Sequence, residues 1–189
     1  MAGTMRTPRR RWIDEGLKAL ADGGPDAVRI ETLATRLGVT KGGFYGHFTN
    51  REALLQEMME AWEHDVIDDV LRTVDAEGAD GPARAVRAGR LTFSPERLPL
   101  DLAIREWARK EPSIAERLRR VDDRRMNLLR EAFGEHFSDP AEVEARSLLA
   151  FSAAIGTHLI IADHGQYTRR DVLARASELL FDPSSSSGA

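Results

Sequence analysis

The sequence predicts an all-α fold of about nine helices, in which a three-helix domain with a helix-turn-helix precedes a larger helical domain. Three observations support this prediction. Apolar residues recur at helical spacing through most of the chain. Glycine and proline separate these periodic segments, as they do where helices end. Residues 30–48 place two short helical segments on either side of Gly38, in the layout of a helix-turn-helix.

The composition indicates a soluble globular protein large enough to bury a core. Of its 189 residues, 42% are hydrophobic and 31% are charged, and the absence of cysteine excludes disulfides and cysteine-ligated metal sites. No apolar run approaches the roughly 20 residues that span a bilayer. The arginines at 9–11 are not followed by the apolar stretch of a secretory signal. We therefore expect a cytoplasmic protein with no membrane partner.

The first helix follows an arm of small and polar residues at 1–8. Its apolar residues form one stripe that we expect to be buried, and Gly23-Gly24-Pro25 ends it. The stripe consists of Trp12, Ile13, Gly16, Leu17, Leu20 and Ala21. This helix would pack across the next two and complete the three-helix form of the motif.

The second and third helices surround a tight turn. Apolar residues at helical spacing predict the second helix over Ile30–Leu37, and Gly38 suits the left-handed conformation that ends many helices. Thr40 is placed to cap the third helix with its hydroxyl, and that helix runs from Lys41 to about His47. The second helix of such a motif enters the major groove of DNA.

The composition of this third helix favours contact with DNA over simple packing. Gly42 and Gly43 each cost about 1 kcal/mol relative to alanine in a helix interior, but they let the backbone approach a phosphate or base edge closely. Lys41, Tyr45 and His47 supply hydrogen-bonding groups around this gap. The alternative interpretation is an ordinary helical hairpin with a glycine turn.

The motif also resembles a known family. The segment from about Arg11 to Leu55 is similar to the amino-terminal signature of the TetR family of transcriptional regulators, with the family's spacing and no gaps. The resemblance is carried by Leu33-Ala34-x-x-Leu37-Gly38-Val39-Thr40-Lys41-Gly42-Gly43-Phe44-Tyr45-x-His47-Phe48-x-x-Arg51-Glu52-Ala53-Leu54-Leu55. Two departures are Val28-Arg29, where the family places a capping threonine, and Gly43, where it often carries a hydroxyl.

Basic residues near the motif are candidate phosphate contacts. Residues 1–50 hold eight Lys/Arg against five Asp/Glu, a net charge of +3, whereas the remainder carries −7, so one end of the protein is suited to face DNA. Arg9 and Arg10 could follow the phosphate backbone, the alternative being a solvated terminus, and the resemblance implies a phosphate contact at Arg51. The predicted DNA-binding residues are Thr40, Lys41, Gly42, Gly43, Tyr45, His47, Arg51, Arg9 and Arg10.

A second domain is predicted at residues 51–181, after a DNA-binding domain at 1–50. Asn50 is placed to cap a long helix that reaches about Asp75, and Asp139-Pro140 is a well-formed start for a later one. Helices are predicted at about 83–93, 98–110, 112–137, 139–163 and 168–181, followed by a disordered tail at 182–189.

The last two predicted helices are the candidate dimer interface. Small and apolar residues share a face, and the resemblance implies a homodimer held by an isologous four-helix bundle. Packing within one chain is the alternative. The predicted interface residues are Leu149, Ala153, Gly156, Ile160, Val172, Ala176 and Leu179.

Aromatic and flexible residues of the second domain are candidates for a pocket, although each can equally serve as core. The candidate effector-pocket residues are Trp62, Met59, Phe93, Trp107, Met126 and His158. Such a pocket would bind a small hydrophobic or aromatic effector, and no cofactor is expected. For His158, we favour a satisfied core histidine over a ligand contact.

The sequence thus predicts a ligand-responsive transcriptional repressor of TetR type that binds a palindromic operator in double-stranded DNA as a homodimer. The alternative is a helix-turn-helix DNA-binding protein with no small-molecule effector. The histidines lack metal-binding spacing and no catalytic motif is present, so neither a metal site nor an enzyme is expected.

Overall fold

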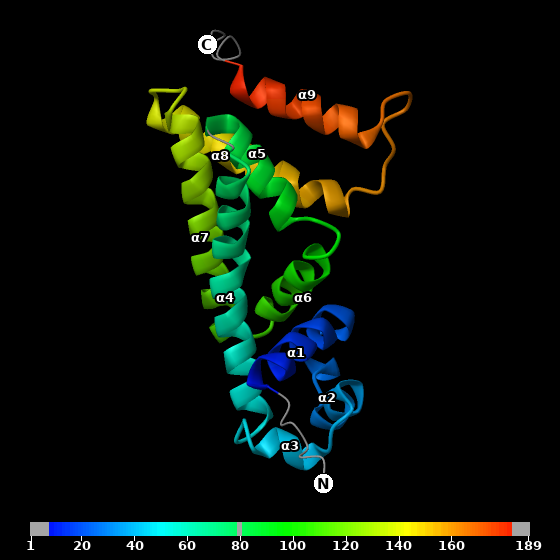
Figure 1. The fold of residues 1–189 in the computed structure, drawn as a ribbon. Helices are drawn as coiled ribbons and strands as arrows, with labels where there is room; N and C mark the ends of the chain where they lie inside the picture. The colour runs from blue at the N-terminus through cyan, green and yellow to red at the C-terminus, as the bar shows by residue number, and fades with distance from the viewer. Residues whose placement is uncertain (1–7, 79–80, 183–189) are drawn as a thin grey trace. The chain divides into compact units, whose positions relative to one another are not determined.

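The computed structural model describes residues 8–78 and 81–182, and these form nine α-helices, one short 3-10 helix and no strand, which confirms the predicted fold class (Figure 1). The helices are α1 (Arg9–Gly23), η1 (Pro25–Ala27), α2 (Ile30–Leu37), α3 (Lys41–Tyr45), α4 (Arg51–Ala76), α5 (Gly81–Thr92), α6 (Leu98–Ala108), α7 (Pro112–Gly134), α8 (Pro140–Leu159) and α9 (Arg169–Phe181). The arm predicted at 1–8 and the tail predicted at 182–189 lie outside the described residues except for Pro8 and Asp182.

The helices pack into two compact units whose limits differ from the predicted domains. The first unit comprises Met1–Val66 and Pro95–Val121, and the second comprises Ile67–Ser94 and Asp122–Ala189. The first unit therefore includes α6 and the beginnings of α4 and α7 in addition to the helix-turn-helix. The physical reason is that α1 packs against α6 as well as against α2.

The first unit has an apolar core to which α1 contributes the predicted stripe. Trp12, Ile13, Gly16 and Leu20 are buried. Gly16 allows the close approach of α1 to α4, because a Cβ atom there would lie 2.6 Å from the sulfur of Met58. The start of α4 is thereby fixed against the helix-turn-helix.

The second unit is held by apolar and aromatic contacts. Val70 and Val74 of α4 pack against α5, while Phe133 of α7 stacks on Phe181 of α9 with ring centroids 4.4 Å apart. Arg146 of α8 donates a hydrogen bond to the carbonyl oxygen of Leu180 at 2.5 Å. This bond secures the end of α9 against α8.

Several predicted helix ends were wrong, since α6 ends at Ala108 rather than at residue 110 and α7 ends at Gly134 rather than at residue 137. The helix α3 ends at Tyr45 rather than His47, and α8 ends at Leu159 rather than Asp163. At Ile160 the backbone is already extended. In contrast, Asn50 caps α4, since its side-chain oxygen accepts a hydrogen bond from the amide of Ala53 at 2.8 Å, and Asp139 caps α8 as predicted.

Candidate nucleic-acid interface

The turn between α2 and α3 is built as the sequence predicts. Gly38 adopts a left-handed conformation with φ of 69°. The amide of Gly38 donates to the carbonyl oxygen of Thr35 at 3.1 Å, and that of Val39 donates to Ala34 at 2.9 Å. These bonds satisfy the last carbonyls of α2 and turn the chain directly into α3.

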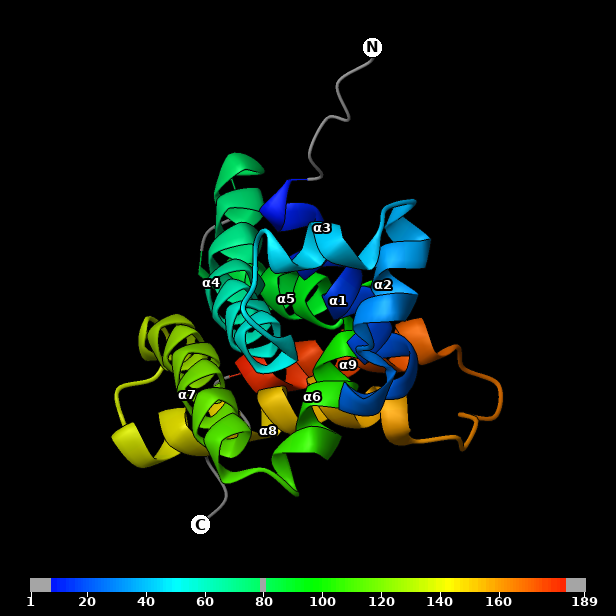
Figure 2. The same cartoon turned by 90° about the horizontal axis from the view of Figure 1, so that it is seen from below.

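One buried aromatic side chain anchors α3. Phe44 is fully buried, where its ring meets the edge of Trp12 at 5.4 Å and stacks on Phe48 at 5.2 Å. In Figure 1, α3 lies at the lower edge of the first unit, and the view from below shows it in front of α1 (Figure 2). Because one side of α3 is fixed in the core, its other side is presented to solvent.

The exposed side of α3 carries the predicted glycine gap. A Cβ atom added to Gly43 would meet no other atom within 4 Å, and one added to Gly42 would meet only the hydroxyl of Thr40, at 3.7 Å. Packing within the chain therefore does not require glycine at either position. The gap instead leaves the backbone of α3 open to an external partner.

Tyr45 borders this gap. Its side chain is 54% exposed, and its ring meets the edge of Phe44 at 5.3 Å. The phenol ring thus packs against the buried ring of Phe44 and is still accessible from solvent. Contact with a base or a phosphate would require this accessibility.

Thr40 occupies the predicted capping position with an extended backbone, but its side chain makes no capping hydrogen bond. The prediction of a hydroxyl cap was wrong. The first turn of α3 is closed by the backbone instead, through the amide of Gly43 and the carbonyl oxygen of Thr40 at 2.9 Å. The exposed hydroxyl is left near the glycine gap.

Lys41 is exposed and forms an ion pair with Glu31 of α2. This hydrogen-bonded pair raises the pKa of Lys41 and lowers the pKa of Glu31. An exposed pair of this kind contributes little stability. Lys41 can therefore exchange its carboxylate partner for a phosphate at small cost.

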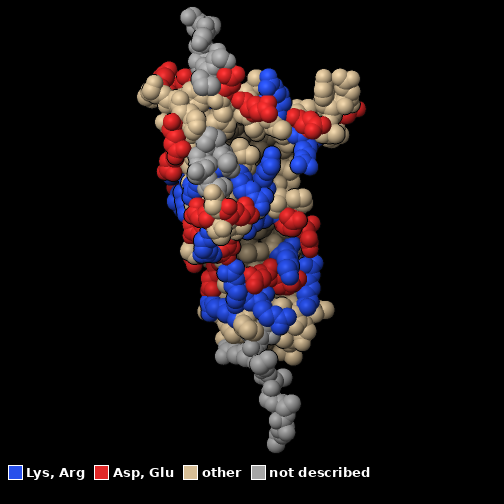
Figure 3. Space-filling model, turned by 45° about the horizontal axis from the view of Figure 1, so that its top comes forward, with Lys and Arg blue, Asp and Glu red and all other residues tan. Residues whose placement is uncertain are grey.

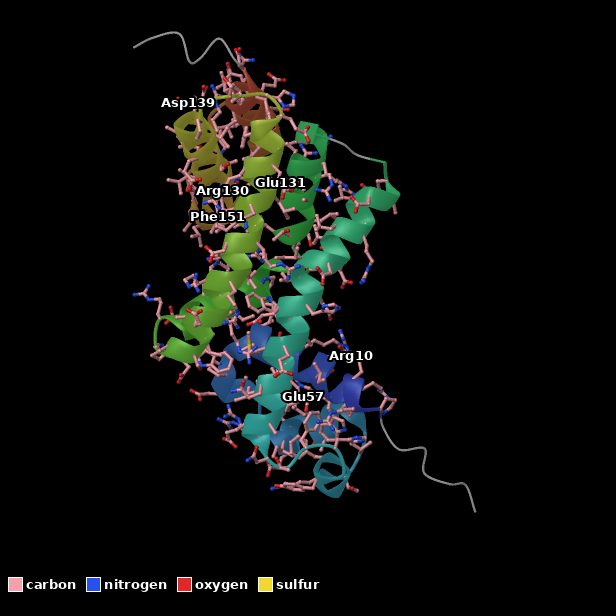
Figure 4. All side chains as sticks on the ribbon, turned by 90° about the vertical axis from the view of Figure 1, so that its left-hand side faces the viewer. Arg10, Glu57, Arg130, Glu131, Asp139 and Phe151 are labelled. Atoms are coloured by element: carbon pink, nitrogen blue, oxygen red, sulfur yellow. The ribbon has the colours of Figure 1, made fainter. Side chains whose placement is uncertain are left out.

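The three arginines predicted as phosphate contacts are held by other parts of the first unit. Arg10 donates to Asp14 at 2.7 Å and to Asp65 at 2.5 Å. Arg9 pairs with Glu57. Figure 4 shows Glu57 on α4 and Arg10 at the start of α1.

Arg51 has a structural partner that sequence reasoning missed. Its Nε donates to the carbonyl oxygen of Val28 at 2.7 Å, and its Nη2 donates to that of Pro25. These carbonyls lie in and just after η1, so Arg51 ties the start of α4 to the entry of α2. Its side chain is half-buried by this arrangement.

His47 lies after the end of α3 and is half-buried. Its Nε2 atom is buried without a hydrogen-bond partner, whereas its carbonyl oxygen accepts a hydrogen bond from Arg9 at 2.6 Å. In this conformation the side chain does not present Nε2 to a base edge, so its predicted part in base reading needs a change of rotamer.

Charged side chains of both signs are interspersed on the face drawn in Figure 3. Sequence reasoning missed the acidic partners Glu31, Glu57 and Asp65 because they lie on other helices than their basic partners. The charge of the helix-turn-helix segment is therefore partly neutralised within the folded chain.

The predicted pocket residues divide between the two units. Met59 and Trp62 are buried in the first unit at 1% and 3% exposure, and Trp107 is half-buried there. In the second unit, Phe93 is buried and Met126 is half-buried. His158 is exposed in the last turn of α8, so its prediction as a core histidine was wrong.

Four of the seven predicted dimer residues line a groove between α8 and α9. The groove has a volume of about 680 Å³, and its lining includes Leu149, Ala153, Ala176 and Leu179. Ile160 is exposed just beyond α8, and Gly156 and Val172 are half-buried. In the part of the chain that the structure describes, none of the helices is long and apolar enough to cross a membrane.

Known proteins with a similar sequence are bacterial regulators. Residues 13–58 match the family model described as bacterial regulatory proteins, tetR family. An uncharacterized HTH-type transcriptional regulator of Pseudomonas putida, TtgW, is 34% identical over 64 residues. That alignment covers 33% of this chain and 47% of TtgW, so the chain matches about half of that relative's length.

Solved structures extend the likeness to the whole fold. A transcriptional regulator from Rhodococcus sp. Rha1 has a TM-score of 0.67 at 20% identity, over 93% of this chain and 94% of that one. A regulator from Saccharomonospora viridis, solved in complex with choline, has a TM-score of 0.70 at 15% identity, over 90% and 93%. The fatty acid degradation regulator FadR from Bacillus halodurans has a TM-score of 0.65 at 17% identity, over 95% and 98%. Residues 13–58 therefore form the amino-terminal domain of the tetR family of bacterial regulatory proteins, and the chain as a whole shares the fold of these solved transcriptional regulators.

Proposed function

We propose that this regulator is a homodimer that binds a palindromic operator in double-stranded DNA through α3 and represses transcription until a small effector binds. The observation that carries the proposal is the open face of α3. Phe44 fixes one side of this helix in the core, and the other side presents the glycine gap, Lys41 and Tyr45 to solvent. Such a surface suits close contact with the floor and walls of a major groove.

The dimer is supported by the distribution of apolar surface. Among the described residues, the exposed large hydrophobic side chains other than Tyr45 all lie between Leu148 and Leu179. Ile161, in the α8–α9 connection, is 97% exposed. Exposed apolar side chains concentrated in one part of a chain favour a protein interface there, and a second copy of the same part would bury them in an isologous contact.

The effector is supported by a relative with the same fold. The Saccharomonospora viridis regulator was solved in complex with choline, so this architecture can hold a small molecule. For the present chain we propose a hydrophobic or aromatic effector, because the candidate residues are mainly aromatic side chains and methionines. Ligand binding would lower operator affinity by favouring a different conformation of the dimer.

A DNA-binding regulator without an effector is the second candidate. It is favoured by the near-complete burial of Met59 and Trp62, which is the environment of core residues. A screen that follows tryptophan emission and DNA release together separates the two candidates. Ligands that change both at the same concentrations support the effector, and a broad screen without such ligands supports the second candidate.

The repressor proposal is tested by recovering genomic DNA fragments on the purified protein and sequencing them. We expect a few fragments to be strongly enriched, and a reporter gene placed behind one of them to be expressed less when the regulator is present. Uniform recovery of fragments would contradict sequence-specific binding, and higher reporter expression would indicate an activator.

A further inference from the structure

The guanidinium group of Arg9 contacts three other groups of the first unit, which are a carboxylate, a backbone carbonyl oxygen and an aromatic ring. Its Nε donates to Oε2 of Glu57 at 2.7 Å, and its Nη2 pairs with Oε1 of the same carboxylate. Its Nη1 donates to the carbonyl oxygen of His47 at 2.6 Å. The guanidinium carbon also lies 4.6 Å from the centroid of the Phe48 ring. All three nitrogens are thus engaged.

These contacts join three elements that bear on α3. Arg9 is the first residue of α1, Glu57 lies on α4, and His47 and Phe48 form the segment by which the chain leaves α3. Phe48 also stacks on Phe44, the residue that anchors α3 in the core. The position of the segment after α3 therefore depends on the Arg9–Glu57 pair.

We propose that Arg9 and Glu57 form a brace that positions α3 for DNA reading, and that Arg9 is a positioning residue rather than a phosphate contact. This inference rests on the proposed DNA-binding function. A planar guanidinium that is bidentate to one carboxylate and bonded to a carbonyl has a fixed orientation. To reach a phosphate, Arg9 would have to give up bonds that hold the exit from α3.

The two roles predict opposite effects for Glu57→Gln. If Arg9 binds phosphate, the substitution releases it and removes a negative charge, so binding to all DNA sequences strengthens. If the pair is a brace, binding to the preferred sequence weakens by about tenfold, a usual size for coupling between two sites. Binding to unrelated DNA changes only as much as the loss of one negative charge causes at any nearby position, because it depends on charge rather than on the position of α3.

A matched control removes the same charge elsewhere on α4. Glu60 lies one turn further along the helix, its side chain is 65% exposed, and its carboxylate is 4.0 Å from Arg117. Glu60→Gln reproduces the change in net charge without touching Arg9. We expect this variant to retain the ratio of specific to non-specific affinity of the wild-type protein.

Arg9→Lys and Arg9→Ala provide a second test that does not depend on Glu57→Gln being folded. Lysine keeps the charge but loses the planar fork, so the brace predicts a loss of about tenfold in specific binding. A phosphate contact predicts near-normal binding by this variant. For Arg9→Ala, the slope of log affinity against log salt concentration stays unchanged if Arg9 is a brace, and becomes shallower by about one unit per subunit if it binds phosphate.

The experiment measures fluorescence anisotropy with a selected operator and with unrelated DNA, over a series of salt concentrations, for the wild-type protein and these four variants. Thermal melting is recorded for each variant. The expected result is a selective loss of operator binding in Glu57→Gln and Arg9→Lys, with an unchanged salt slope in Arg9→Ala. Equal or tighter operator binding by Glu57→Gln would overturn the brace while leaving the DNA-binding function intact. Failure of the wild-type protein to bind any DNA selectively would instead overturn the proposed function, and the brace with it.

Discussion

The guanidinium of Arg51 donates a hydrogen bond to the carbonyl oxygen of Val28 at 2.7 Å, across 23 residues of sequence. A second bond from the same side chain reaches the carbonyl oxygen of Pro25. Arg51 thereby joins the first turn of α4 to the segment that precedes α2. A cation at the start of a helix is unfavourable to the helix dipole, and these carbonyls provide its compensation.

Arg51→Ala is therefore expected to destabilise the protein as well as to affect DNA binding. Hydrogen bonds that involve a charged group contribute about 1.5–3 kcal/mol, and their loss leaves the two carbonyls to solvent or unpaired. Chemical denaturation should show a decrease of this order. Arg29→Ala serves as a control, because the exposed Arg29 donates to the carbonyl oxygen of Asp26 at 3.1 Å. A loss in Arg51→Ala no larger than in the control would show that the bonds to Pro25 and Val28 contribute little.

Gly43→Leu is expected to abolish specific DNA binding without unfolding the protein. The structure has open space at this position, so the leucine is accommodated within the chain but would hold α3 away from the groove. Anisotropy and thermal melting distinguish these effects. Normal operator binding by Gly43→Leu would place the DNA-reading surface elsewhere.

Tyr45→Phe is expected to lose a single hydrogen bond, on the order of 1 kcal/mol of binding free energy. The ring keeps its edge contact with Phe44, so the stability of the folded domain should not change. Unchanged operator affinity would exclude a contact by the phenol hydroxyl.

Acidification is expected to weaken the Arg9–Glu57 pair. The hydrogen bonds from Arg9 hold the pKa of Glu57 below its ordinary value. The pair therefore contributes its full stability above the unfolded pKa, about 4.3, and that contribution is lost as the pH falls through the lower folded pKa. Melting temperatures between about pH 5 and pH 3 should decrease more steeply for the wild-type protein than for Glu57→Gln. Parallel curves would show that the pair adds no pH-dependent stability.

Gly156→Arg is expected to prevent dimer formation. A Cβ atom added to Gly156 would have open space within its own chain, so we expect the monomer to fold. In the proposed interface, however, it would bury an unpaired charge. Sedimentation should show monomers of Gly156→Arg and of Leu179→Glu, with palindrome binding lost in both. Dimers in both variants would place the interface outside α8 and α9.

Local signals were enough to predict the helices that carry the site. Gly38 adopts the left-handed conformation that glycine favours, and Asn50 and Asp139 cap the helices that they precede, because these features depend on residues only a few positions apart. The exposed glycine gap of α3 also agrees with the sequence interpretation. The Thr40 cap failed because its hydroxyl accepts no hydrogen bond from the backbone amides of α3, an outcome that the residue type alone does not determine.

Long-range partners could not be predicted from the sequence. Arg9 and Glu57 are separated by 48 residues, and Arg10 and Asp65 by 55. Neither pair has a periodic or motif signal, because each depends on how α4 packs beside α1. The same limit applies to α8, where an unbroken apolar pattern predicted helix to Asp163 but the chain extends from Ile160 onward. Arg169 donates to the carbonyl oxygens of Ile160 and Ala162 at 2.8 and 3.3 Å and holds this extended segment.

Selection of bound sequences from a random DNA library with the purified wild-type protein tests whether a homodimer reads a palindromic operator through α3. We expect two inverted copies of one half-site, with centres about 34–36 Å apart or a multiple of that distance, because each copy of α3 would enter its own major groove. The same selection with Gly43→Leu should yield no enriched sequence. A wild-type selection without enrichment, or enrichment of an asymmetric site that Gly43→Leu binds equally well, would show that α3 does not read a palindromic operator.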